Sequence, residues 1–168
     1  FVVELKNFND IRTTDLDKMG SRSSPTGEIY LTDTRVPKEN ILGNPGDGAK
    51  IVFGSLNQTR LSAAAGAVGL AQACLDEAID YAMNRVQFGK PIINLQAIQM
   101  MIADMVMDLE LIRMLSYRAA RIGDAGLKAD RAVTATKLFC NEALVRIADA
   151  ALQIHGANGY SEDYAIER

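Results

Sequence analysis

One long run without proline decides the fold that this sequence predicts: residues 51–85 are IVFGSLNQTRLSAAAGAVGLAQACLDEAIDYAMNR. Apolar residues recur in it at spacings of three and four, which is the pattern of a helix with one buried face. A helix over about 47–85 would be roughly 58 Å long at the usual rise per residue. A compact globule of this chain length has a radius of gyration of only about 15 Å. An element this long therefore indicates a bundle of long helices.

Two further helices of the same kind follow. One is expected over about 95–122, with Asn94 as its N-cap and the glycines of 123–126 as its stop. The other is expected over about 130–155 and stops at the GANG sequence of 156–159. Short connections make consecutive helices antiparallel. We predict a mainly α chain in which the open apolar flank favours self-association, with 163–168 as the first turn of a fourth helix.

The first 46 residues show a different pattern, in which β-like runs at 1–5, 13–16 and 28–33 alternate with turns. Two or three strands cannot bury a face of their own, so we expect the missing strands of a β domain to precede Phe1. Neither end of the chain carries a natural start or stop signal. We therefore expect the chain to be a piece of a larger protein.

Composition excludes several classes of protein. Hydrophobic residues make up 48% of the chain, charged residues 23%, and the net charge is −3. Acidic and basic residues are evenly spread, which argues against binding to nucleic acid or to a membrane surface. No apolar run is long enough to span a membrane. Two separated cysteines, without a metal-binding cluster, favour a reducing compartment over secretion and predict no metal site.

Few residues offer chemistry. The single histidine, His155, stands at a helix end without a nucleophile beside it in sequence, and we interpret it as a ring that contacts the last helical carbonyls. The GNPGDG run at 43–48 is interpreted as a turn before the long helix, because its aspartate would repel phosphate. The NQTR patch at 57–60 is by default a solvated helix face.

The run RVQFGK at 85–90 is more suggestive, because it places two cations, an amide and an aromatic ring at a sharp turn. Such a set can grip a pyrophosphate and stack on a ring. A basic helix C-terminus favoured by the helix dipole explains the same cations equally well.

Five segments with characteristic spacing carry a resemblance to a known family: KMGSRSS at 18–24, VPKENILG at 36–43, RL at 60–61 with AGAVGLAQ at 65–72, RVQFGKP at 85–91 with Gln96, and QIHGANGY at 153–160. With these motifs the chain resembles the acyl-CoA dehydrogenases, flavoenzymes that desaturate acyl-CoA thioesters between the α and β carbons. The resemblance implies that 1–46 is the C-terminal end of a middle β domain. It also implies that 47–168 is an incomplete C-terminal four-helix bundle of a homotetramer or dimer.

The resemblance also implies site residues. Arg85, Gln87, Phe88 and Gln96 would reach the diphosphate and adenosine side of FAD held by a neighbouring subunit. The segment Gln153, Ile154, His155, Gly156 and Ala157 would line the diphosphate of the same cofactor. Asn57, Thr59 and Arg60 match the region that contacts the CoA thioester.

The family's catalytic glutamate stands either just before the arginine of the long helix or beyond the Gly-Tyr turn. The first position is Thr59 here, so the resemblance implies that the base lies past Arg168 and that this chain alone is inactive. The implied parent is an oxidoreductase of fatty acid metabolism, in the bacterial cytoplasm or the mitochondrial matrix, with an acyl-CoA substrate and an electron-transfer flavoprotein as acceptor. A helical oligomerisation module without activity, and a parent acyl-CoA oxidase or flavin-dependent hydroxylase, are the alternatives.

Overall fold

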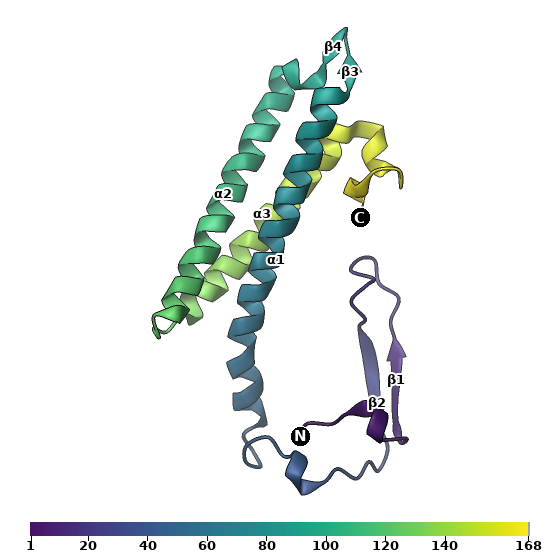
Figure 1. The fold of residues 1–168 in the computed structure, drawn as a ribbon, viewed down its shortest axis with the longest axis vertical. Coiled ribbons are helices and arrows are strands. Elements are labelled where there is room, and N and C mark those ends of the chain that lie inside the picture. Colours follow the sequence, from purple (N-terminus) through teal and green to yellow (C-terminus); the bar gives the residue numbers. More distant parts are fainter. Residues whose placement is uncertain (168) are drawn as a thin grey trace. The chain divides into compact units, whose positions relative to one another are not determined.

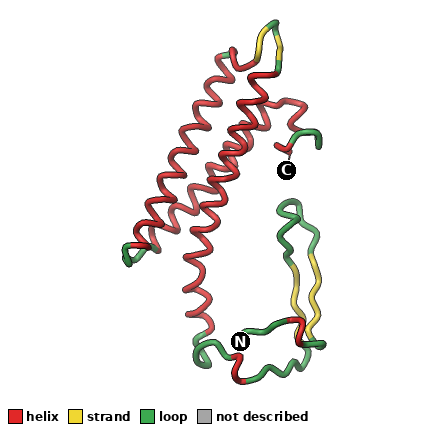
Figure 2. The backbone as a smooth tube through the Cα atoms, viewed as in Figure 1, coloured by secondary structure: helices red, strands yellow, loops and turns green. Residues whose placement is uncertain are grey.

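The computed structural model describes residues 1–167, and three long helices dominate it (Figure 1). The elements in chain order are η1 (Leu5–Asn7), β1 (Ile11–Asp15), β2 (Gly27–Leu31), η2 (Lys38–Asn40), α1 (Gly48–Asn84), β3 (Val86–Gln87), β4 (Lys90–Pro91), η3 (Ile92–Asn94), α2 (Gln96–Asp124), α3 (Asp130–His155), η4 (Gly156–Tyr160) and η5 (Ala165–Glu167). Helix accounts for most of the described chain, and strands are few and short (Figure 2). The predicted mainly α fold with long antiparallel helices is confirmed.

The chain divides into two compact units, one ending at Phe53 and the other beginning at Gly54. In the first unit β1 and β2 form an antiparallel hairpin whose register runs from Ile11 opposite Leu31 to Asp15 opposite Gly27. The strand predicted at 1–5 is wrong, because its partner is not a strand: Val2 N donates to Asn40 O and Val2 O accepts from Asn40 Nδ2, both at 2.8 Å, and Asn40 belongs to η2. Every residue of β2 is exposed, as expected for a hairpin without a covering layer.

The run at 43–48 is a turn, as predicted. Gly43 and Gly46 both have positive φ, at 72° and 99°, which glycine adopts without steric cost. The carboxylate of Asp47 accepts hydrogen bonds from the backbone and side-chain nitrogens of Asn44, at 3.0 and 3.1 Å. These bonds close the turn, and α1 begins at Gly48.

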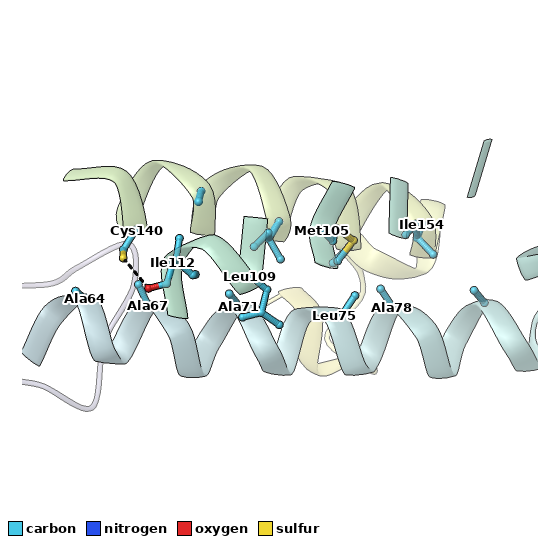
Figure 3. Close-up of a cluster of buried hydrophobic side chains, with 14 of the residues drawn as sticks. Ala64, Ala67, Ala71, Leu75, Ala78, Met105, Leu109, Ile112, Cys140 and Ile154 are labelled. Carbon is cyan, nitrogen blue, oxygen red and sulfur yellow. Dashed lines mark hydrogen bonds between the residues drawn. The ribbon is translucent and has the colours of Figure 1, made fainter. Parts of the chain in front are cut away.

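In the second unit α1, α2 and α3 share one hydrophobic core (Figure 3). The contribution of α1 is a stripe spaced by three and four residues that is almost entirely alanine: Ala64, Ala67, Ala71, Leu75, Ala78 and Ala82. Larger side chains face it, among them Met105, Leu109 and Ile112 of α2. Small residues on one helix allow large ones on the next to pack closely against it. The spacing that predicted the helices is the spacing of this core.

Two details differ from expectation at the helix ends. Asn94 is not the N-cap of α2, because it closes the 3₁₀ turn η3 and Leu95 occupies the cap position without a side-chain cap bond. The first turn of a fourth helix expected at 163–168 is instead the 3₁₀ turn η5, and Arg168 lies outside the described residues. None of the helices described within residues 1–167 is long and apolar enough to cross a membrane.

Candidate functional site

The turn between α1 and α2 carries the first candidate residues. Val86 pairs with Pro91 and Gln87 with Lys90, which leaves Phe88 and Gly89 as a two-residue hairpin loop. Both loop residues have positive φ, 56° at Phe88 and 77° at Gly89, as a type I′ turn requires. A phenylalanine in the left-handed region is strained, and its ring is 87% exposed. The hairpin imposes this conformation, and a phenylalanine held there with its side chain in solvent marks a candidate functional position.

Polar groups beside that ring are free to bind a ligand. Arg85 and Gln87 are both exposed. Within residues 1–167 no carboxylate forms an ion pair with Arg85, and neither its guanidinium nor the Gln87 amide has a hydrogen-bonding partner. The backbone of Arg85 is fixed, because its N–H donates to Tyr81 O at 2.8 Å and its carbonyl accepts from Ile92 N at 2.9 Å. A fixed backbone with a free cation is a suitable arrangement for gripping an anion.

The end of α3 supplies the second group. His155 is 3% exposed, and its Nδ1 lies 2.8 Å from the carbonyl oxygen of Ala151 in the last helical turn. The interpretation of His155 as a ring that contacts a late helical carbonyl is therefore confirmed. Gly156 follows with φ 60°, which turns the chain sharply out of the helix. Ile154 and His155 are both buried, and Gly156 and Ala157, which follow them, are exposed.

These two groups meet in one surface hollow of about 230 Å³. Its lining, drawn from the end of α1, the turn after it and the end of α3, is Tyr81, Arg85, Gln87, Ile92, Ile154, His155, Gly156, Ala157 and Asn158. Six of the nine predicted cofactor residues are among them. Phe88, Gln96 and Gln153 are exposed but do not line the hollow.

The charge of the hollow comes from one residue. Arg85 lines it and no acidic side chain among the described residues does. Both α1 and α3 end here, and the C-terminus of a helix carries a partial negative charge. The positive charge of Arg85 is therefore what makes this hollow suitable for a phosphate group.

The residues predicted to contact substrate lie far from the hollow. Arg85, which directly follows α1, stands 26 positions after Thr59, or about 39 Å along the helix at the usual rise. Asn57 donates through Nδ2 to Asp130 Oδ1 at the start of α3, and it accepts from Arg60 Nη1 at 3.1 Å. Thr59 is exposed and its hydroxyl donates to Leu56 O at 2.9 Å. The structure thus joins Asn57 and Arg60 in one hydrogen-bonded set.

Sequence reasoning missed three residues of the hollow, Tyr81, Ile92 and Asn158, and it also missed Tyr164 beside them. Tyr81, Asn158 and Tyr164 interact around the His155 ring. Tyr81 carried a signal, because it stands one helical turn before Arg85 and so lies on the same side of α1. Asn158 carried another, because it stands within the QIHGANGY segment at 153–160. No group of three or more His, Cys, Asp or Glu residues in the part of the chain that the structure describes could hold a metal ion.

Comparison with known proteins identifies the family. Residues 46–168 match the family model described as "Acyl-CoA dehydrogenase, C-terminal domain". The chain belongs to the acyl-CoA dehydrogenase family. The resemblance carried by the five segments is therefore confirmed.

Relatives in this family match along the whole chain. A glutaryl-CoA dehydrogenase from Desulfococcus multivorans is 55% identical over 169 residues, covering 100% of this chain and 43% of the relative. The caffeyl-CoA reductase–Etf complex subunit CarC from Acetobacterium woodii is 40% identical and covers 100% of this chain and 44% of its own length. A solved glutaryl-CoA dehydrogenase–glutaryl-CoA complex has a TM-score of 0.95 at 54% identity, covering 100% of this chain and 43% of that one. The chain thus spans less than half the length of these relatives.

Proposed function

We propose that the protein to which this chain belongs is an FAD-dependent acyl-CoA dehydrogenase. The observation that carries the proposal is the hairpin at 85–90, where a strained, exposed Phe88 stands near an Arg85 that forms no ion pair within residues 1–167. Proteins keep such strain where a binding site needs it. Membership of the family supports the reaction type.

The residues present fit FAD. The guanidinium of Arg85 suits the diphosphate, the Gln87 amide offers a donor and an acceptor, and the Phe88 ring is free to stack on adenine. Gln96 and Gln153 flank these groups as further exposed amides. Gly156 and Ala157 present backbone with little side chain, which allows close approach of the cofactor. Bound FAD would supply the acceptor for the hydride that leaves the β carbon of the substrate.

At the other end of α1 this chain's own residues would bind and orient the acyl-CoA. Arg60 is held through Asn57 and Asp130, so its direction is set before any ligand arrives. Thr59 cannot take a proton from a thioester α carbon, because a neutral hydroxyl is a poor base at physiological pH. We place the carboxylate base outside residues 1–168, and we expect this chain alone to bind no FAD tightly and to show no turnover.

Short acyl-CoA esters are the substrate class that we propose, because a 55% identical relative is named for glutaryl-CoA. An electron-transfer flavoprotein is the proposed acceptor, since the CarC relative is named as part of a complex with Etf. We further propose a homo-oligomer in a reducing compartment, the bacterial cytoplasm or the mitochondrial matrix, with the domain boundary at residue 46.

The test uses the intact protein loaded with FAD under anaerobic conditions. Glutaryl-CoA and butyryl-CoA are added in separate titrations, and the flavin absorbance is followed. We expect at least one ester to bleach the flavin, with acetyl-CoA, which has no β carbon, as the control that leaves it oxidised. An intact protein that takes up no FAD, or a flavin that neither ester reduces, would contradict the proposal.

A further inference from the structure

A cluster of aromatic rings stands directly behind the candidate cofactor hollow. Tyr81 of α1 stacks on His155 of α3 with ring centroids 4.2 Å apart and planes inclined by 28°. Tyr164 meets both rings edge-on, at centroid distances of 5.7 and 5.8 Å. These three rings, here called the aromatic cluster, join three segments that are distant in sequence.

One amide fastens this cluster to the turn after α3. Asn158 donates through Nδ2 to the Tyr81 hydroxyl at 2.9 Å and to the Tyr164 hydroxyl at 3.4 Å. Asn158 is half-buried, so these bonds compete with water less than surface bonds do. The Tyr81 hydroxyl therefore holds η4 against the end of α1.

Each member of this set adjoins a residue predicted to contact FAD. The carbonyl oxygen of Tyr81 accepts a hydrogen bond from the backbone N–H of Arg85, so the two residues share the last turn at the end of α1. His155 precedes Gly156, and Asn158 follows Ala157. A shift of Asn158 relative to Tyr81 would therefore move one wall of the hollow relative to the other.

Two rings of the cluster also line two hollows of different charge. Tyr81, Arg85, His155 and Asn158 line both the cofactor hollow and a second hollow of about 280 Å³. The second one is also lined by Glu77 and Asp80, whose carboxylates disfavour phosphate. We expect an anionic ligand to prefer the cofactor hollow, which has no acidic residue in its described lining, as long as the four shared residues keep their positions.

From these contacts we propose that Tyr81 and Asn158 are positioning residues of the cofactor site, which fix the backbone at 156–157 at the correct distance from Arg85. The inference rests on the proposed function. It assigns to the Tyr81 hydroxyl a role in FAD affinity that is exerted through its hydrogen bond with Asn158.

The test compares FAD dissociation constants of the intact protein, measured by flavin fluorescence at 25 °C on apoprotein that remains folded. Tyr81→Phe keeps the ring stack and removes only the hydroxyl, and we expect it to weaken FAD binding about 3- to 10-fold. Asn158→Ala should weaken it similarly. The double variant should lose no more than about Asn158→Ala alone, because Asn158→Ala already removes the bond to the Tyr81 hydroxyl. Tyr117→Phe, at an exposed tyrosine of α2, is the matched control and should leave the constant unchanged.

A purely structural role predicts something else. It would lower the unfolding temperature of the Tyr81→Phe apoprotein and leave its FAD dissociation constant at the wild-type value, which would overturn the inference. Additive losses in the double variant would overturn it as well. If wild-type protein takes up no FAD, the proposed function itself fails, and that outcome is visible before any variant is made.

Discussion

At Phe88 the backbone conformation suits a different residue from the one present. Asparagine tolerates positive φ, and Asn-Gly is a favoured pair for a type I′ hairpin loop. Phe88→Asn should therefore raise the free energy of unfolding by about 1 kcal/mol. The same change removes the exposed ring, and we expect FAD binding to weaken about 5- to 100-fold, the range found for a base stacked on an aromatic side chain. Chemical denaturation and an FAD titration of the intact protein measure the two effects. Loss of stability with unchanged FAD affinity would show that the ring serves the fold.

The two cysteines make a separate prediction at this scale. Burial raises the pKa of the Cys140 thiol, and Cys140 is 0% exposed in the core. Burial also raises the pKa of Cys74. Because the thiolate is the reactive form, both should react slowly with thiol reagents at neutral pH, Cys140 only as fast as the protein unfolds. A thiol whose pKa is higher in the folded than in the unfolded protein stabilises the fold at pH values below its unfolded-state pKa. This stabilisation is lost as the pH rises through the folded-state pKa, so alkaline pH should destabilise the core. Labelling rates of Cys74→Ala and Cys140→Ala proteins between pH 7 and about 10 test this, and fast neutral labelling of Cys140 would refute it.

Among the elements, α1 depends most on small side chains. Ala71 is 0% exposed and faces Leu109 and Ile112 across the core (Figure 3). Ala71→Leu should lower the free energy of unfolding by about 1–3 kcal/mol, because the inserted methyl groups have no free volume to occupy. Ala73→Leu changes an exposed position of the same helix and should stay within about 0.5 kcal/mol of wild type. Denaturant unfolding of both variants checks the pair, and equal losses would mean that the alanine stripe does not determine the packing.

The spacing of apolar residues predicted the long helices well, because that pattern lies within each helix itself. The helix expected over 47–85 is Gly48–Asn84, and the one expected over 130–155 has those bounds, because three-and-four spacing follows directly from burying one face. The run at 1–5 failed because a strand depends on a partner strand, which no local pattern reveals. The pairing of Tyr81 with Asn158 was also out of reach, because the two residues are 77 positions apart and only the packing of α1 beside α3 brings them together. By contrast, the residues of the hairpin at 85–90 were identifiable because they are consecutive.

For the whole molecule, the exposed apolar side chains of the helices predict association. They include Met100, Met107 and Met114 on α2 and Leu138 and Val145 on α3, with Met107 64% exposed. Met100, Met107 and Met114 are spaced by seven residues, which places them on one face of α2, and an apolar face in water favours association. We expect the 168-residue chain alone to sediment as an oligomer and the double variant Met107→Asp/Met114→Asp to shift it toward monomer. A wild-type chain that stays monomeric at micromolar concentration would contradict this.

The central claim, that the hollow at the ends of α1 and α3 holds the FAD diphosphate, is tested most directly at Arg85. Arg85 provides the positive charge of that hollow and forms no ion pair within residues 1–167, so its removal should not disturb the fold. The measurement is the FAD dissociation constant of the intact protein with Arg85→Ala, beside Arg118→Ala as an exposed arginine elsewhere in the bundle. Loss of a charge-assisted hydrogen bond predicts FAD binding about 10- to 100-fold weaker for Arg85→Ala, with Arg118→Ala like wild type. Wild-type affinity in the Arg85→Ala protein would contradict the claim.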